Sequence, residues 1–286
     1  MVTMFRSLVI IFSLTVSGAA LGQETTVGFR HGTILVFEQT STQVIVVVDS
    51  RIHDESSKWD GYACKVVNLS DDTLFFYTGN LFEAINQRTG KVFFSQQSVA
   101  RAAYDYFQKE FRSENRLMDV ANKYSELVRP AINELLKSVK NPANYIALAG
   151  FASRDELNIP RIVPVNIPIQ VPNDGGQAYT GPPALSEPIL NTPLSGQYTQ
   201  YNQVAEFWNA ETPRAKQAMD EYNSRATKLP EKDKEAYRLI AAVEFALKWN
   251  RHDPTIGPPV DAVVIEPETG IRWIRRKPKC FEKPNR

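Results

Sequence analysis

Apolar residues follow two different periods along this chain, and the two kinds of segment alternate. Runs with strand character occur at residues 31–51, 62–69, 73–78, 145–151, 159–171, 260–267 and 271–277. Helical apolar spacing occurs at about 96–112, 115–140, 199–226 and 231–250, with Pro130 as an expected kink in the second segment. The order is therefore strands, two helices, strands, two helices, strands.

This order, together with one strand, predicts the fold class. Residues 44–48, VIVVV, contain no polar position, so both faces of that strand are expected to be buried. A strand covered by a second sheet on one side and by helices on the other fits an α+β, four-layer αββα sandwich of two antiparallel sheets. Eight prolines between residues 160 and 193 predict an edge strand and a Pro-rich loop at about 160–198.

The first 22 residues have the pattern of a secretory signal peptide. Arg6 supplies a positive charge, LVIIFSLTV supplies an apolar core too short for a comfortable membrane span, and Ala20-Leu21-Gly22 supplies small residues near a cleavage site. We therefore expect a secreted or periplasmic protein whose chain starts near Gln23 after signal removal. No membrane span is expected in that chain, and residues 33–286 are expected to form a single domain.

Charge and cysteine content restrict the classes of partner. The chain has 33 basic and 32 acidic residues, and without Arg6 the two numbers are equal, which gives no electrostatic reason to expect nucleic acid or an anionic membrane as partner. Three histidines and two cysteines cannot make a closed zinc site of familiar spacing, and neither a metal nor a cofactor is predicted. In an exported chain, Cys64 and Cys280 are compatible with a disulfide or with two unpaired thiols.

The two N-terminal hairpins place four chemically useful groups at their open ends. If the first hairpin turns at its Thr-Ser-Thr sequence, Thr33 faces Asp49, and if the second turns at its Asp-Asp sequence, Lys65 faces Gly79. Residues directly opposed across two strands have Cβ atoms roughly 4.5–5.5 Å apart. With adjacent strands in register, a hydroxyl, a carboxylate, an ammonium group and a glycine N–H would gather at one sheet end.

Such a set can carry out nucleophilic catalysis. A threonine hydroxyl needs a base to remove its proton, and as the first residue of a mature chain Thr33 could use its own α-amine, with a pKa of roughly 7.7–8.0. Lys65 would lower the pKa of that amine and stabilise negative charge on the oxygen, while Asp49 would orient Lys65. The Gly79 N–H would bind the oxyanion of the substrate.

Each of these residues also has a purely structural interpretation. Threonine is a common strand residue, and Asp49 before a serine could end a strand and cap a turn. Lys65 within an apolar run needs a partner, which a structural ion pair would supply. Gly79 before an asparagine is a turn signal. Only the combined spacing favours a catalytic site.

That spacing resembles the proteasome β-subunit group of N-terminal-nucleophile (Ntn) hydrolases. Thr33 is followed by Asp49-Ser50-Arg51 sixteen residues on, by Lys65 sixteen residues later and by Gly79 fourteen residues after that. Gly32-Thr33 resembles the self-cleavage junction of that family, which makes residues 23–32 a predicted propeptide. The resemblance implies an αββα fold with Thr33 as nucleophile and amine base, Lys65 and Asp49 as its electrostatic support, and Gly79 as oxyanion donor.

The match extends to the C-terminal region with departures. The segment NRHDPTIGPPVDAVVIEPETGIRW looks like the helix end and final strands of a β-subunit, where Asp253 matches an aspartate that helps to position the terminal amine. The family's serine before Gly257 is replaced by Ile256, and only Thr180-Gly181 could stand for its second Ser-Gly. The loss of both hydroxyls would imply a slow or inactive enzyme.

The same match also implies a substrate pocket. Tyr77 would form the base of a shallow apolar pocket, with Ile52, Ala63 and Leu81 around it. Ordinary strand packing is an equally good explanation of Tyr77.

The function predicted from these observations is an exported threonine-type amide hydrolase, a peptidase that activates itself by cleavage between Gly32 and Thr33. Two alternatives remain open, a catalytically inactive structural or binding subunit of the same fold, and a hydrolase of small amides. The family's assembly into rings also implies a homo-oligomer.

Overall fold

The computed structural model describes residues 27–31, 34–54, 60–62, 64–79, 83–86, 92–110, 116–139, 141–142, 147–155, 157–185, 194–198, 203–253 and 256–277. The predicted signal peptide lies outside these residues. Five residues of the predicted propeptide lie within them and form the first strand.

All helices and strands below belong to this described part of the chain. The elements up to residue 136 are β1 (Val27–His31), β2 (Leu35–Gln39), β3 (Val44–Asp49), β4 (Arg51–Asp54), β5 (Asp60–Tyr62), β6 (Val66–Asn68), β7 (Thr73–Gly79), β8 (Glu83–Asn86), β9 (Val92–Ser95), α1 (Gln96–Glu110) and α2 (Arg116–Leu136). The remaining elements are β10 (Ala147–Arg154), β11 (Pro160–Ile167), β12 (Ile169–Gln170), β13 (Tyr179–Thr180), β14 (Ala184–Leu185), β15 (Leu194–Tyr198), α3 (Gln203–Asn209), α4 (Pro213–Ala226), α5 (Glu231–Trp249), β16 (Val260–Glu266) and β17 (Gly270–Arg275).

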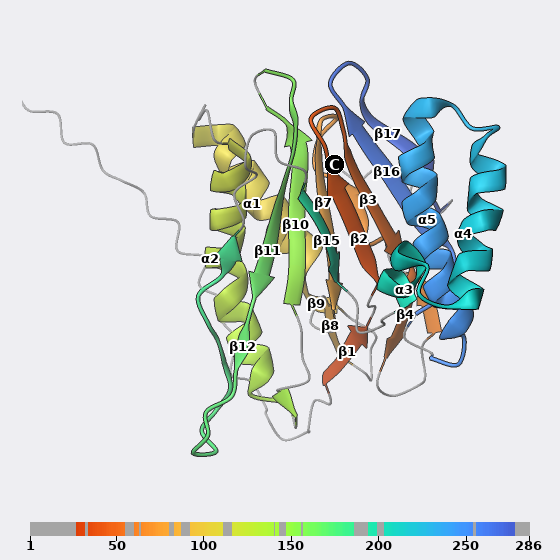
Figure 1. Cartoon of the computed structure of the whole chain (residues 1–286). Coiled ribbons are helices and arrows are strands. Elements are labelled where there is room, and N and C mark those ends of the chain that lie inside the picture. Colours follow the sequence, from red (N-terminus) through yellow and green to blue (C-terminus); the bar gives the residue numbers. More distant parts are fainter. Residues whose placement is uncertain are drawn as a thin grey trace, which may run out of the picture.

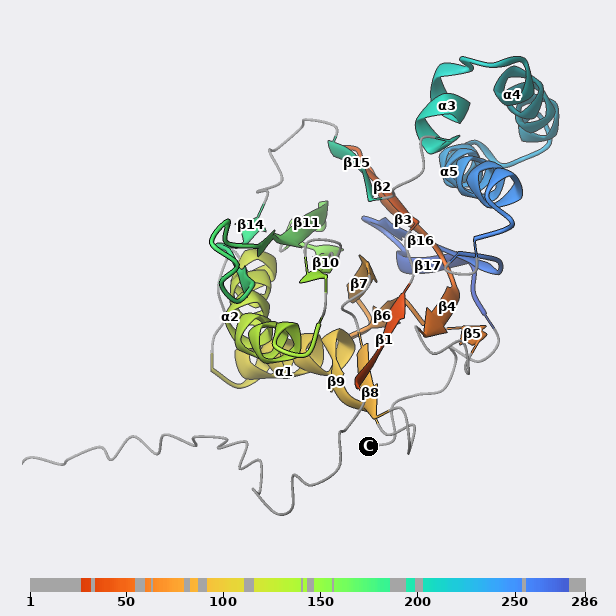
Figure 2. The ribbon, with the colours of Figure 1, turned by 90° about the horizontal axis from the view of Figure 1, so that it is seen from below.

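Two five-stranded antiparallel sheets face each other, and helices lie on their outer sides. The strand orders are β15-β2-β3-β16-β17 and β14-β11-β10-β7-β6. Figures 1 and 2 show α1 and α2 outside the second sheet and α3, α4 and α5 outside the first. The predicted α+β class with antiparallel sheets is confirmed.

The prediction of only two sheets is wrong. A third five-stranded sheet has the order β5-β4-β1-β8-β9, and β12 and β13 form a small two-stranded sheet. β1, within the predicted propeptide, pairs with β4 on one side and β8 on the other. The third sheet was missed because its strands are only 3–5 residues long and none shows a clear alternation of apolar and polar positions.

β3 lies at the centre of the molecule and is buried on both faces, as its unbroken apolar run predicted. Val44, Val46 and Val48 pack between the two sheets, against residues of β6, β7, β10 and β11. Ile45 and Val47 point the other way and pack against α5. All five side chains are 0% exposed.

The actual turns change the register of both N-terminal hairpins. In the first, the Thr40 N–H donates to the Gln43 carbonyl at 2.8 Å, so the loop is two residues long and Leu35 pairs with Val48. Asp49 therefore lies opposite Ile34, one residue after the predicted Thr33, and the Asp49 N–H donates to the Ile34 carbonyl at 3.0 Å.

The second hairpin is displaced by two residues. Val66 pairs with Phe76, and the Tyr77 N–H donates to the Lys65 carbonyl at 3.0 Å. Lys65 therefore faces Tyr77 rather than Gly79, which instead pairs with Ala147 of β10. The cause is the turn, in which the Leu69 N–H donates to the Thr73 carbonyl at 2.8 Å.

The helical segments agree well with the predicted ones, with one exception. Pro130 lies inside α2, whose buried side chains face the second sheet. The helix predicted at 199–226 is divided into α3 and α4, because Ala210 adopts a φ of 48° and Thr212 caps a new helix by accepting a hydrogen bond from the Ala215 N–H. Within the described residues, no helix is both long and apolar enough to span a membrane.

Gly150 of β10 makes room for an aromatic ring in the core between the sheets. A Cβ atom at this position would lie 2.2 Å from Cζ of Phe76, which is 0% exposed. We therefore expect Gly150→Ala to lower the free energy of unfolding by about 1–3 kcal/mol through overpacking. Urea denaturation checks this, with Phe76→Leu as the companion change. Because the shorter side chain relieves the overlap, the double variant should lose less than the two single variants together, and strictly additive losses would contradict this explanation.

Candidate functional site

Asp49, the last residue of β3, is the meeting point of three separate segments. Its side chain is fully buried. Oδ1 accepts hydrogen bonds from the Ile34 N–H at 3.1 Å and from Lys65 Nζ at 2.8 Å, and Oδ2 accepts one from the Gly257 N–H at 3.3 Å. Three donors from separate parts of the chain therefore satisfy both oxygens of this buried carboxylate.

Lys65 is the buried cation that pairs with Asp49. Both side chains are 0% exposed. Burial lowers the pKa of the Lys65 ammonium below its usual value, while the charges of Asp49 and Asp261 oppose that shift. The two residues were predicted to meet through adjacent strands of one sheet, but β3 and β6 belong to different sheets, and the ion pair forms between the sheets.

Gly257 joins the C-terminal part of the chain to this pair. Its carbonyl accepts hydrogen bonds from the Ser50 N–H at 3.3 Å and the Arg51 N–H at 3.4 Å. A Cβ atom at residue 257 would lie 2.7 Å from Cδ of Arg51. Glycine therefore allows this backbone to run closely beside β4 while it donates to Asp49.

A second buried ion pair lies next to the first and was missed in the sequence. Lys277 Nζ is 2.9 Å from Asp261 Oδ2, and both side chains are almost fully buried. The Lys277 N–H also donates to Asp261 Oδ1 at 3.0 Å, and the Ser50 hydroxyl lies 3.5 Å from Asp261 Oδ2. The available signal was an aspartate within the apolar run VDAVVIE, the same kind of signal that singled out Lys65.

The other predicted catalytic residues are placed as follows. Thr33 lies outside the described residues, and Ile34 follows it directly in the chain. Gly79 ends β7 with a φ of 101°, which glycine adopts readily. Asp253 lies in the turn after α5, where its N–H donates to the Asn250 carbonyl at 2.9 Å.

Neither position proposed for the family's missing hydroxyls supplies one beside Asp49. Ile256 is 2% exposed and belongs to the core between α5 and the first sheet. Thr180 packs against α2 instead, where its N–H donates to Asn133 Oδ1 at 2.7 Å and its carbonyl accepts from Arg129 at 3.4 Å.

The predicted pocket residues are only partly described. Tyr77 is 1% exposed, lies in the core between the second sheet and α1 and α2, and stacks on Phe75 with ring centroids 5.5 Å apart. This is the packing role that the sequence left open as an alternative. Ile52 is the second residue of β4, while Ala63 and Leu81 lie outside the described residues.

The disulfide question is decided for Cys64, which is disulfide-bonded. It immediately precedes Lys65, and its carbonyl accepts a hydrogen bond from the Tyr77 hydroxyl at 3.2 Å. The chain has one other cysteine, Cys280, which lies outside the described residues. The buried charges are thus directly adjacent to a covalent cross-link.

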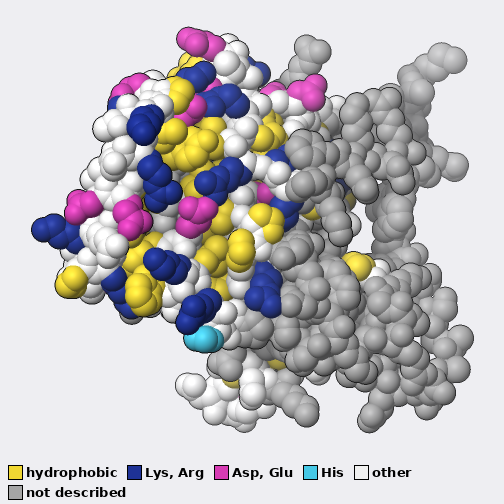
Figure 3. Space-filling view, turned by 90° about the vertical axis from the view of Figure 1, so that its right-hand side faces the viewer, with side chains coloured by type: hydrophobic (Ala, Val, Ile, Leu, Met, Phe, Trp, Pro, Cys, Tyr) yellow, Lys and Arg dark blue, Asp and Glu magenta, His cyan; other side chains and the backbone are white. Residues whose placement is uncertain are grey.

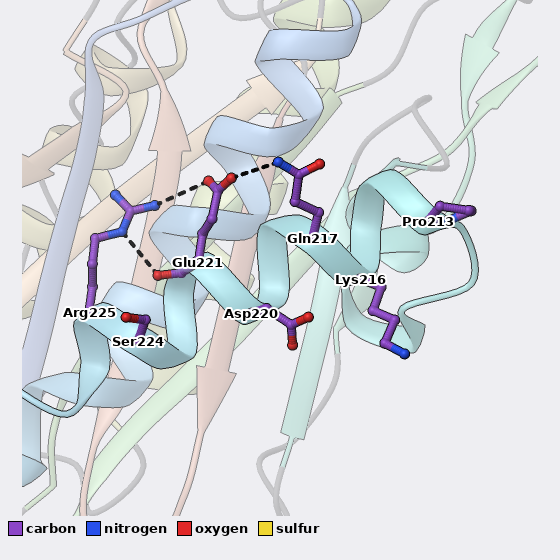
Figure 4. A pocket seen from close by; sticks show the side chains of 7 residues that line it. All are labelled: Pro213, Lys216, Gln217, Asp220, Glu221, Ser224 and Arg225. Atoms are coloured by element: carbon purple, nitrogen blue, oxygen red, sulfur yellow. Dashed lines mark hydrogen bonds and ion pairs between the residues drawn. The ribbon is translucent and has the colours of Figure 1, made fainter.

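Elsewhere on the described surface, a shallow depression follows one face of α4. Figure 4 shows its polar lining, in which Glu221 contacts Gln217 and Arg225. Figure 3 shows basic, acidic and apolar side chains interspersed on the side of the molecule that carries α4 and α5. No group of histidine, cysteine and acidic side chains that could hold a metal ion occurs among the described residues. These features do not adjoin the buried ion pairs and suggest no chemistry of their own.

Comparison with models of protein families and with curated proteins finds no match to this chain.

Proposed function

We propose that this protein is an exported threonine-type amide hydrolase of the Ntn kind, with Thr33 as its nucleophile and peptides as its substrates. The observation that carries the proposal is the carboxylate of Asp49, which binds both the Ile34 N–H and the Lys65 ammonium through one oxygen. Those two nitrogens are therefore within about 6 Å of each other. Since Thr33 precedes Ile34 directly, the nucleophile needs no long reach to meet Lys65.

In the proposed mechanism, the terminal amine of Thr33 accepts the hydroxyl proton while the oxygen attacks the substrate carbonyl. The buried Lys65 ammonium stabilises the negative charge on the attacking oxygen, and Asp49 fixes the position of that ammonium. The Gly79 N–H, at the end of β7, would bind the oxyanion. No cofactor enters these steps.

Two further features support the proposal. Helices outside two facing antiparallel sheets are the layer order of the αββα sandwich that the Ntn resemblance implies. The disulfide at Cys64 favours an oxidising compartment, as expected for a secreted or periplasmic protein.

One observation favours a second candidate, an inactive structural or binding subunit with this fold. Ile256, at the position where the resemblance expects a serine, is buried in apolar core and can offer no hydroxyl to a terminal amine. A chain of this kind would keep the ion pairs but never free Thr33. Its ring assembly, also implied by the resemblance, would then be its main activity.

Self-cleavage separates the two candidates. We expect the chain secreted from a producing host to begin at Thr33, as shown by intact mass under denaturing conditions, which are needed because β1 is hydrogen-bonded between β4 and β8. Thr33→Ala should retain residues 23–32, whereas Thr33→Ser, which keeps a hydroxyl, should still be cleaved.

The outcome that would contradict the enzyme is equally definite. If the unchanged chain and Thr33→Ala both begin near Gln23 after prolonged incubation of the folded protein, the hydrolase is excluded and the inactive subunit is favoured. For a chain that does cleave itself, turnover of peptide amides against small acyl amides, with Thr33→Ala as the blank, identifies the substrate class.

A further inference from the structure

The second ion pair extends the buried charges around Asp49 into a set of four. Asp261 and Lys277 come from β16 and from the segment after β17, and are joined both by their side chains at 2.9 Å and by the Lys277 N–H at 3.0 Å. The resemblance assigns no role to either residue. Burying two more charges carries a desolvation cost, and apolar side chains of similar volume often give an equal or higher stability. Stability alone therefore does not account for this second pair.

The position of Asp261 follows from the alternation along β16. Val263 and Ile265 point into the core between the two sheets, so Asp261 lies on the same face of the strand. Its cross-strand neighbour is Val48, the residue before Asp49. Asp261 therefore enters the inter-sheet layer at the end where Lys65 meets Asp49.

The four charges act on one another. Burial lowers the pKa of both lysines, and the Lys65 charge lowers the pKa of Lys277 further. The charges of Asp49 and Asp261 oppose these shifts in both lysines. Lys65 thus lies near two carboxylates, and Lys277 neutralises the one that Lys65 does not bind. In the described residues, the charged and titratable groups that face Lys65 are Asp49, Asp261, Lys277 and Tyr77, and Arg276 lies near Asp261.

We propose that Lys277 is a positioning residue of the candidate site: by pairing with Asp261, it keeps the Lys65 ammonium on Asp49 instead of shared between two carboxylates. Without the Lys277 charge, Asp261 would compete for Lys65 and draw it away from Ile34. The arrangement of charges does not depend on the proposed function, while its effect on catalysis rests on the proposed hydrolase.

Titration of the lysine side chains tests the arrangement without any enzyme activity. The protein is the full-length chain with Thr33→Ala, followed by NMR of the Lys65 and Lys277 side chains as the pH is raised. Because two interacting groups titrate as a pair, we expect each signal to report the ionisation of the other. Two independent single-step titrations would overturn the proposal, and this measurement needs no further substitution.

Charge variants in the same background give the expected directions. Lys277→Met leaves Asp261 uncompensated and should raise the pKa of Lys65 by about one unit or more. Asp261→Asn should move the first lysine ionisation to lower pH. Two variants keep the net charge of the pair, Lys277→Arg and the double variant Asp261→Asn/Lys277→Met. In both, the pKa of Lys65 should stay near that of the unchanged pair. An unchanged Lys65 titration in both single variants would overturn the proposal, even if both are less stable.

The catalytic part is tested in the self-cleaved protein with Thr33 intact. The alkaline limb of the pH profile of kcat/KM should move with the Lys65 pKa in each variant. In Lys277→Arg, which keeps the positive charge, the limb should lie where it lies in the unchanged protein. A limb that stays fixed while the NMR value moves overturns the positioning role. If no self-cleavage occurs at all, the proposed function fails, and the lysine titrations still decide the charge arrangement.

Discussion

Lys65→Met should slow self-cleavage, and the amide hydrolysis that depends on it, by on the order of 10²–10³-fold. The variant should also unfold about 3–5 kcal/mol more easily, because it leaves the Asp49 carboxylate buried beside an apolar side chain. Methionine is unbranched like lysine and only one atom shorter, so most of the packing is retained without the charge. The measurements are intact mass, turnover of a peptide amide and urea denaturation at neutral pH.

A neutral double variant is the matched control. Asp49→Asn/Lys65→Met removes both charges, and the asparagine oxygen can still accept from the Ile34 N–H. It should therefore recover part of the lost stability while remaining inactive, because the asparagine NH2 group cannot accept from the Gly257 N–H that Asp49 Oδ2 binds. Full activity in Lys65→Met would refute the proposed mechanism, and unchanged stability would refute the importance of the buried pair.

The stability difference between the unchanged protein and Lys65→Met should also depend on pH. Burial lowers the pKa of Lys65 below the usual 10.5, so in the alkaline range below that value the unfolded chain holds a proton that the folded protein has released. Stability rises with pH wherever the unfolded state binds more protons. The difference in free energy of unfolding between the unchanged protein and Lys65→Met should therefore grow as the pH approaches 10.5. Parallel urea denaturation of the two proteins at a series of pH values can follow it.

The second large effect concerns the disulfide. Cys64→Ser should lower the free energy of unfolding by about 2–5 kcal/mol, because the cross-link restricts the unfolded chain. The change should also loosen the candidate site, since Cys64 is adjacent to Lys65 and its carbonyl accepts a hydrogen bond from the Tyr77 hydroxyl. Urea denaturation with and without a thiol reductant measures it.

The reductant itself supplies the control for this prediction. Reduction should lower the unfolding midpoint of the unchanged protein to that of Cys64→Ser. The midpoint of Cys64→Ser itself should not change when reductant is added. A midpoint of the unchanged protein that does not move after complete reduction would show that the cross-link contributes nothing to stability.

Much of the architecture could be predicted because it depends on local periodicity. The buried run 44–48 indicated a central strand, and the helical spacing identified α1, α2 and α5 to within a few residues. The break at Ala210 was not visible, because a single residue of positive φ leaves no trace in an apolar pattern.

The contact between Asp49 and Lys65 was predicted correctly, but for an incorrect geometric reason. Asp49 and Lys65 do meet, yet each hairpin register depended on one or two turn residues, which spacing alone does not determine. Asp261 and Lys277 could not be paired in advance, since their contact depends on how the C-terminal segment returns over the sheet.

The three donors on Asp49 have a consequence for the timing of maturation. One of them belongs to residue 34 and another to residue 257, so the carboxylate is fully bound only after the chain has been synthesised through residue 257. A nascent chain that has not yet emerged as far as residue 257 would lack the last of these contacts. In the proposed hydrolase, self-cleavage would therefore wait until residue 257 has folded against β3, so that partly synthesised chains would be inactive.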